Sequence, residues 1–125
     1  AAEAPRWFAP SELIELLHDP KANAPSGTAL STALGLGGDQ RRRVESVEIV
    51  PGARGADVDG VRVHSVRLPG LLAHQEVLLG NPGEVLTIRH DSLDRSSFVP
   101  GVLLALRSVG GLTEPMTVGL DSLLR

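Results

Sequence analysis

One short segment combines the residue types that could bind or react with an anion. Pro25-Ser26-Gly27-Thr28 precedes apolar residues at helical spacing, which predicts a helix capped by Ser26 that ends at the glycines at positions 35, 37 and 38. The first N–H groups of a helix are unpaired and carry partial positive charge. Because Gly27 has no side chain, an anion could approach the backbone closely, and a carboxylate would fit there.

Two side chains before this helix add further chemistry. Lys21 could supply a cation and His18 a proton donor, which together would suit an anionic carbonyl or imine compound. The residues alone favour a plainer alternative, in which Ser26 is an ordinary N-cap beside two solvated side chains.

Other residue clusters indicate structure rather than chemistry. Gly35-Leu36-Gly37-Gly38 lacks the spacing and the preceding strand of a dinucleotide-binding loop, so it is interpreted as a helix stop. His74 and His90 lie beside carboxylates without metal-ligand spacing, which favours hydrogen-bonded histidines and no metal site. The chain has no cysteine, which excludes disulfides, zinc thiolates and cysteine nucleophiles and favours a cytoplasmic protein.

Composition narrows the class of protein further. The chain has 125 residues, of which 42% are hydrophobic and 22% charged, as expected for one ordinary globular domain. A net charge of -3 and only three aromatic residues argue against nucleic-acid binding, and the run Arg41-Arg42-Arg43 is diluted by acidic neighbours. No stretch of about 18 apolar residues exists, so no membrane partner is expected.

The order of the elements predicts an α+β fold with a mixed sheet of four to five strands and two main helices. Residues 12–17 fit a short strand or one helical turn equally well. The segments 61–68, 72–79 and 84–90 predict a strand meander, and further strands are expected at 44–50 and 117–120, with a turn-rich loop at 55–60. The second helix follows Asp91, with Ser96 or Ser97 as its cap and Gly110-Gly111 as its stop.

The predicted sheet carries apolar side chains on both faces. Two short helices cannot cover both faces, so part of the sheet should be buried against another subunit or another domain. Of these two, a homo-oligomer that assembles through the sheet is the simpler interpretation.

Several motifs resemble those of a known family. The stretch from Glu12 to Ala29 closely resembles the signature of 4-hydroxy-tetrahydrodipicolinate reductase, also called dihydrodipicolinate reductase, a pyridine-nucleotide-dependent reductase of the diaminopimelate and lysine pathway. Later stretches resemble its actinobacterial members, namely Pro51-Gly-Ala-Arg54-Gly, Val61-Arg-Val-His64-Ser-Val-Arg67-Leu, Ala73-His74-Gln-Glu76-Val, Thr87-Ile-Arg-His90-Asp-Ser and Asp94-Arg95-Ser-Ser-Phe98-Val-Pro-Gly101-Val.

The resemblance implies a substrate-binding and tetramerisation domain that spans residues 1–125, and a homotetramer whose sheets pair across subunits. It also implies that Lys21 and His18 contact a small dicarboxylate substrate and that Ser26, Gly27 and Thr28 bind one of its carboxylates. Lys21 is the residue to which a catalytic role carries over.

Two departures from the family pattern limit the expected activity. The family's N-terminal Rossmann domain is absent from these residues, so NADPH or NADH is expected only where such a domain is supplied. Leu17 stands where the family has a histidine taken to be the general acid, and Asn23 replaces the usual aspartate. A leucine cannot deliver a proton.

These departures leave three functional hypotheses. The first is a substrate-binding and oligomerisation domain that cannot carry out the reduction by itself. The second is a stand-alone descendant recruited for a cofactor-independent cyclisation or isomerisation of a less polar ligand, which the apolar Leu17 suggests. The third is a non-catalytic oligomeric scaffold.

Overall fold

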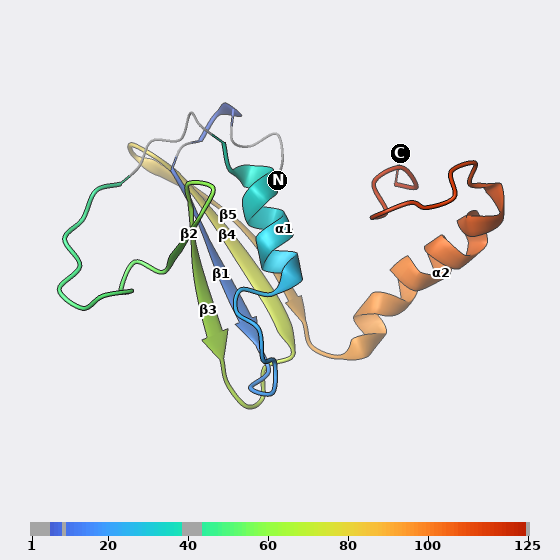
Figure 1. The fold of residues 1–125 in the computed structure, drawn as a ribbon, viewed down its shortest axis with the longest axis horizontal. Coiled ribbons are helices and arrows are strands. Elements are labelled where there is room, and N and C mark those ends of the chain that lie inside the picture. The colour runs from blue at the N-terminus through green and yellow to red at the C-terminus, as the bar shows by residue number, and fades with distance from the viewer. Residues whose placement is uncertain (1–5, 9, 39–43, 125) are drawn as a thin grey trace. The chain divides into compact units, whose positions relative to one another are not determined.

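The computed structural model describes residues 6–8, 10–38 and 44–124. They form two compact units, Ala1–Asp91 and Ser92–Arg125. The first unit holds a five-stranded sheet and one helix, and the second holds the other helix (Figure 1). This is the α+β fold with a mixed sheet and two helices that the sequence predicts.

The central strand of the sheet is also the first in the chain. The strands are β1 (Ser11–Leu17), β2 (Ala56–Val58), β3 (Val61–Arg67), β4 (Ala73–Asn81) and β5 (Glu84–Ser92), and their order across the sheet is β2-β3-β1-β4-β5. β1 pairs in parallel with β3 and antiparallel with β4, whereas β2 pairs antiparallel with β3. The two strands that flank β1, β3 and β4, therefore both come later in the chain.

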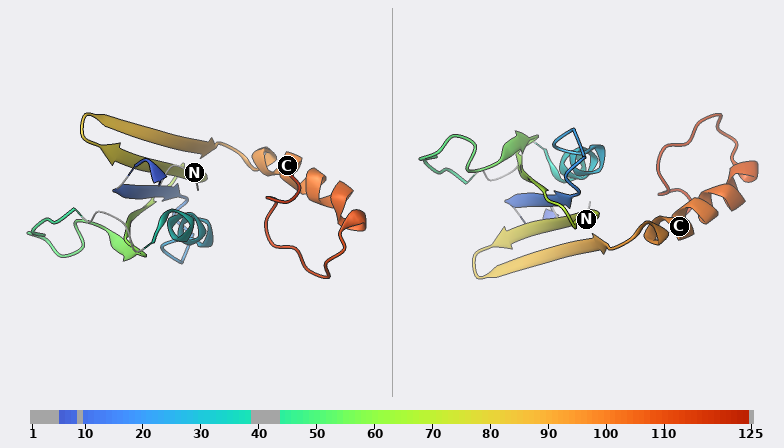
Figure 2. Two further views of the ribbon diagram at one scale, coloured as in Figure 1. Left: turned by 90° about the horizontal axis from the view of Figure 1, so that it is seen from above. Right: turned by 90° about the horizontal axis from the view of Figure 1, so that it is seen from below.

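Helix α1 (Gly27–Leu36) covers one face of this sheet (Figure 2). Its buried residues Ala29, Ala33 and Leu36 form the core together with sheet residues whose side chains point to the same face: Leu13, Val61, Val63, Val77 and Leu79. Since side chains alternate along a strand, the odd-numbered residues of β1 face α1 and the even-numbered residues face the opposite side.

The predicted strand meander is only partly right. β4 and β5 are neighbours, but β1 lies between β3 and β4. The loop predicted at 55–60 contains β2, which turns into β3 through Asp59 and Gly60, both with positive φ. An Asp-Gly pair at such a turn is a strong hairpin signal, which the composition-based prediction of a loop overlooked.

Two further strand predictions are wrong. Residues 44–50 and 117–120 contain no strand. The first of these segments is instead an arm in which Val47 and Ile49 are almost fully exposed and no neighbouring strand is available for pairing. The basic run Arg41-Arg42-Arg43 lies outside the described residues.

The second unit begins with a 3-10 turn, η2 (Arg95–Phe98), which continues into α2 (Val99–Ser108) and η3 (Val109–Gly111). The Asp94 side chain caps η2 by accepting the N–H of Ser96 at 2.7 Å, so the predicted caps Ser96 and Ser97 are wrong. The carboxylate is the stronger acceptor for an exposed N–H. In the part of the chain that the structure describes, neither helix has the length and apolar character needed to cross a membrane.

Candidate functional site

The residues predicted to bind an anion lie on the loop between β1 and α1, here called the β1–α1 loop (residues 18–26), and on the first turn of α1. The N–H of His18 donates to the carbonyl of Leu72 at 3.3 Å, and the N–H of Lys21 donates to the carbonyl of His18 at 3.2 Å. The second bond closes a tight turn directly after β1, and the first joins the start of that turn to the segment between β3 and β4. His18 and Lys21 are therefore held at opposite ends of one turn.

The N-terminus of α1 has the cap that the sequence predicts. Ser26 has extended backbone geometry, its Oγ accepts the N–H of Ala29 at 3.2 Å, and its carbonyl accepts the N–H of Leu30 at 2.9 Å. Within residues 10–38 and 44–124, the N–H groups of Gly27 and Thr28 have no hydrogen-bond acceptor, and both residues are exposed. Two backbone donors at the positive end of the helix are thus available to a ligand.

A buried carboxylate lies beneath this helix end. Glu15 is 1% exposed and accepts the N–H of Ser26 on both oxygens at 3.1 Å, the hydroxyl of Ser65 at 2.7 Å and Nη2 of Arg67 at 2.8 Å. Burial by itself would raise the pKa of Glu15. The hydrogen bonds from Ser26, Ser65 and Arg67 outweigh that effect and hold the pKa below its ordinary value of 4.5.

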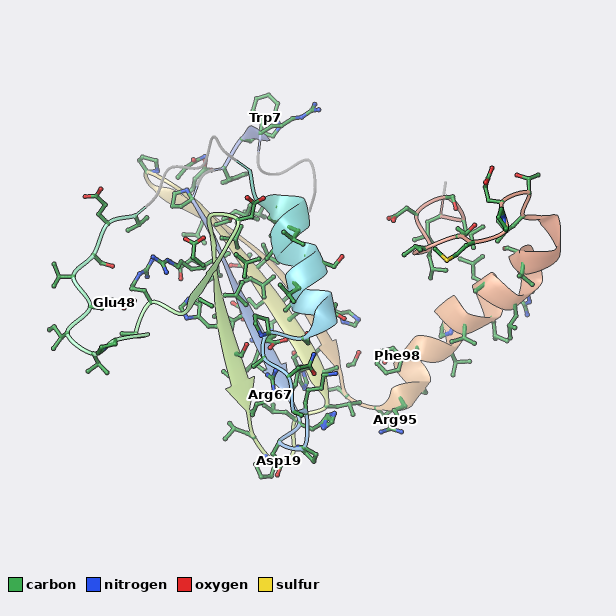
Figure 3. All side chains as sticks on the ribbon, in the orientation of Figure 1. Trp7, Asp19, Glu48, Arg67, Arg95 and Phe98 are labelled. Atoms are coloured by element: carbon green, nitrogen blue, oxygen red, sulfur yellow. The ribbon has the colours of Figure 1, made fainter. Side chains whose placement is uncertain are left out.

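Arg67 connects this carboxylate to the β1–α1 loop. Its Nη2 also donates to the carbonyl of Asn23 at 2.8 Å, and its Nε donates to the carbonyl of Lys21 at 3.3 Å. In Figure 3 the side chain of Arg67 lies beside this loop, which carries Asp19 at its tip. The guanidinium group therefore bonds at once to the core carboxylate and to the backbone of the loop.

Sequence reasoning did not identify Glu15, Ser65 or Arg67 as site residues. The sequence did contain a signal for Glu15. This residue lies two positions after Leu13, so in a strand both side chains point to the face that carries the core. A charged residue on the core face of a strand requires partners. The identity of the partners could not be inferred, because β1 pairs with a strand that follows much later in the chain.

Leu17, the position matched to the family's proposed proton donor, is the last residue of β1. In the sheet it lies between Arg67 of β3 and Ala73 of β4, on the same face as Glu15. Its side chain is half-buried. An apolar side chain therefore stands on the α1 side of the sheet at this position.

The opposite face of the sheet carries separate polar clusters. Glu12 accepts Nη2 of Arg54 at 2.5 Å and lies 2.8 Å from Nε2 of His64. Burial alone would raise the pKa of Glu12, but hydrogen bonds from His64 and Arg54 hold it below 4.5. This cluster fastens the end of the exposed arm to β1 and β3.

A second cluster on that face joins β4 to β5. His74 lies 2.7 Å from Asp91, and Arg89 bonds to both Asp91 and Glu76. The hydrogen bonds from Arg89 and His74 lower the pKa of Asp91. His74 is thus a hydrogen-bonded sheet histidine, as predicted, and no group of side chains suited to a metal ion exists among the described residues.

The glycines after α1 do not fit a nucleotide phosphate. A Cβ atom on Gly37 would lie 2.6 Å from the carbonyl oxygen of Asp59 and 2.7 Å from its carboxylate. Gly37 therefore allows the end of α1 to pack against the β2–β3 turn, beside a negative charge. In the described part of the chain, no strand leads into a glycine-rich loop of the dinucleotide-binding kind.

Comparisons with known proteins agree with this fold. A family model described as "Dihydrodipicolinate reductase, C-terminus" matches residues 1–124. The chain is 59% identical to 4-hydroxy-tetrahydrodipicolinate reductase of Nocardia farcinica and 53% identical to that of Thermobifida fusca, covering 99% of this chain and 52% and 53% of those proteins. It therefore spans about half the length of these relatives.

A solved structure is similar in three dimensions. It is the dipicolinate-bound dihydrodipicolinate reductase from Paenisporosarcina sp. TG-14, with a TM-score of 0.84 and 42% identity over 97% of this chain and 47% of that one. The central strand, the capped helix and the sequence matches lead to one assignment. The chain belongs to the dihydrodipicolinate reductase family and corresponds to its C-terminal part.

Proposed function

We propose that this chain is the substrate-binding part of a 4-hydroxy-tetrahydrodipicolinate reductase and binds a small dicarboxylate at the start of α1. The observation that carries the proposal is the pair of unpartnered amides at Gly27 and Thr28. Such amides bind carboxylate oxygens without the cost of breaking a bond within the protein. Ser26 orients them, and Lys21 and His18 are proposed to contact the rest of the ligand.

The ligand class is supported by a relative. The similar solved structure is described as dipicolinate-bound, and dipicolinate is a planar pyridine with two carboxylates. One carboxylate would bind the two amides, and the ammonium group of Lys21 would neutralise charge on the ligand. A hydrogen bond to a charged group contributes about 1.5 to 3 kcal/mol, whereas micromolar binding corresponds to about 8 kcal/mol after the entropy cost of association. The proposed site therefore needs contacts to both carboxylates of the ligand.

The chain by itself is proposed not to catalyse the reduction. None of the described strands leads into a glycine-rich loop of the dinucleotide-binding kind, and Leu17 cannot donate a proton. NADPH or NADH would serve as hydride donor only where a nucleotide-binding domain is supplied. The cytoplasmic location expected from the sequence stays a prediction.

Assembly through the sheet is part of the proposal. β5 is an edge strand whose other side has no strand partner among the described residues, and Val85, Leu86 and Ile88 on it are 69%, 37% and 40% exposed. An exposed apolar edge strand is a ready template for pairing with another chain. We therefore propose a homotetramer in which these strands are buried between subunits.

Calorimetric titration with pyridine-2,6-dicarboxylate tests the proposed function. One binding site per chain is expected, with Lys21→Ala weakening the affinity about tenfold. Arg107→Ala removes a positive charge from α2 and should leave the affinity unchanged. Absence of binding by the unmodified chain, or equal losses in the two variants, would refute the proposed site.

The reduction itself needs a separate assay. Oxidation of NADPH by the isolated chain in the presence of the family's substrate is expected to be undetectable, and turnover would overturn this part of the proposal.

A cofactor-independent cyclisation or isomerisation is the second candidate, and the position of Leu17 on the α1 side of the sheet favours it. An apolar side chain there suits a less polar ligand. Full affinity for pyridine-2,6-dicarboxylate counts against this second candidate. A chain that assembles but binds neither ligand class would instead be the non-catalytic scaffold.

A further inference from the structure

We infer that Arg67 and Glu15 are positioning residues that set the conformation of the β1–α1 loop and of the helix end that follows it. The inference rests on the proposed function, because the groups they position are those proposed to bind the dicarboxylate. Neither residue is proposed to contact the ligand.

Arg67 holds the first part of the β1–α1 loop. Its side chain is 18% exposed and lies at the end of β3, and it donates to the loop carbonyls of Lys21 and Asn23. The carbonyl of Lys21 belongs to the residue whose ammonium group is proposed to bind the ligand. This hydrogen bond fixes the backbone of Lys21, and it therefore restricts the positions that the Lys21 ammonium group can reach.

Glu15 holds the other end of the loop. The N–H of Ser26 is shared between both of its carboxylate oxygens. Ser26 in turn caps α1, so the position of its backbone decides where the free amides of Gly27 and Thr28 point. One ion pair therefore bonds to the loop at residues 21, 23 and 26.

Charge compensation gives this pair a second role. A carboxylate beneath the N-terminus of α1 would repel an incoming carboxylate if it stood alone. The Arg67 guanidinium lies 2.8 Å from the Glu15 carboxylate and neutralises it, and Ser65 adds a hydrogen bond at 2.7 Å. The helix end can thus be held by an acidic side chain and still attract an anion.

The other side of β1 supplies a matched control. Glu12, also on β1, forms an ion pair with Arg54, but that pair fastens the arm rather than the β1–α1 loop. Arg67→Lys and Arg54→Lys make the same chemical change in two arginine–glutamate pairs of one strand. Both keep the positive charge, whereas a lysine cannot reproduce the forked contacts of an arginine.

Two measurements on the full chain test the inference. The affinity for pyridine-2,6-dicarboxylate should fall about tenfold in Arg67→Lys and remain unchanged in Arg54→Lys. In the ligand-free chain, amide hydrogen exchange at Ser26 should become about tenfold faster in Arg67→Lys only. Thermal unfolding of both variants checks that a general loss of stability does not explain the difference.

The outcomes separate this inference from the proposed function. Equal affinities in the two variants would overturn the positioning role, and so would equal exchange at Ser26. If the unmodified chain binds no dicarboxylate, the proposed function fails. Faster exchange at Ser26 in Arg67→Lys would then still establish that the ion pair holds the loop, and unchanged exchange would refute that as well.

Discussion

Glu15 shows how a charged residue can be stable in the core of a small sheet. Removing a carboxylate from water costs several kcal/mol, and the cost is offset only where hydrogen bonds and an opposite charge replace the water. Ser26, Ser65 and Arg67 provide those contacts within 3.1 Å. The same contacts join the core to the loop proposed to bind the ligand.

Replacing Glu15 should reveal this energy through its pH dependence. Because the pKa of Glu15 is lowered in the folded state, its stabilising contribution is complete above the unfolded-state pKa near 4.5 and is lost as the pH falls through the folded-state pKa. Glu15→Gln should therefore lower the free energy of unfolding by about 2 to 4 kcal/mol at pH 7. The difference should shrink below about pH 4.5, as measured by urea unfolding between pH 7 and pH 3.

A variant of the other glutamate on β1 checks the assignment. Glu12 is about one quarter exposed, so Glu12→Gln should cost less than Glu15→Gln at pH 7. A pH-independent difference between Glu15→Gln and the unmodified chain would contradict the proposed ionisation.

At the scale of single residues, local features could be predicted and distant ones could not. The Ser26 cap was predictable because the capping hydroxyl and the N–H that donates to it lie within one turn of helix. The role of Glu15 depends on Ser65 and Arg67, which lie 50 and 52 positions away. Only the parallel pairing of β1 with β3 brings them together.

At the scale of elements, pairing decides where apolar sequence becomes a strand. The stretch from Glu12 to Leu17 was ambiguous from its pattern and is a strand because β3 and β4 pair with both of its edges. The arm at 44–50 is richer in β-branched residues than that stretch, but none of the described strands pairs with it. Instead Glu48, far out on the arm in Figure 3, accepts the N–H groups of Gly52 and Arg54.

The end of this arm depends on a glycine. Gly55 has φ of 69°, and a Cβ atom there would lie 2.5 Å from the carbonyl oxygen of Val63 and 2.9 Å from Nδ1 of His64. Gly55→Ala should therefore lower the free energy of unfolding by at least about 2 kcal/mol, since it adds a backbone collision to the strain of a positive φ. Urea unfolding measures the change.

Gly70 provides the control for that prediction. Its φ of 86° is also positive, but nothing lies within 4 Å of the position of an added Cβ atom. Gly70→Ala should thus cost only the conformational strain, about 1 kcal/mol. Equal losses in the two variants would show that the close approach of Gly55 to β3 contributes nothing.

At the scale of the whole molecule, part of the large share of apolar residues lies on the surface of the chain. Leu86 and Ile88 are partly exposed on an edge strand. The sequence predicted such surplus apolar area, but not which strand carries it at the edge, because strand order depends on pairings between residues far apart in the chain.

Charges on β5 should disrupt the proposed assembly. The double variant Leu86→Lys, Ile88→Lys is expected to reduce the mass in light scattering from four subunits to one, because lysines on an edge strand oppose pairing with another chain. Leu30→Lys, Leu34→Lys places the same charges on partly exposed positions of α1 and should leave the mass unchanged. A tetramer in both double variants would exclude β5 from the interface.

The central place of β1 also sets an order of events during synthesis. β1 is among the first described residues to leave the ribosome, yet its two partners are β3 and β4, which end at Arg67 and Asn81. Contacts between residues far apart in sequence slow folding, because a long loop must close before any strand pairing stabilises it. In the nascent chain, β1 and its apolar face therefore stay unpaired until β3 and β4 have been made. During this interval the exposed strand is prone to aggregation, and a chaperone that binds it would prevent this.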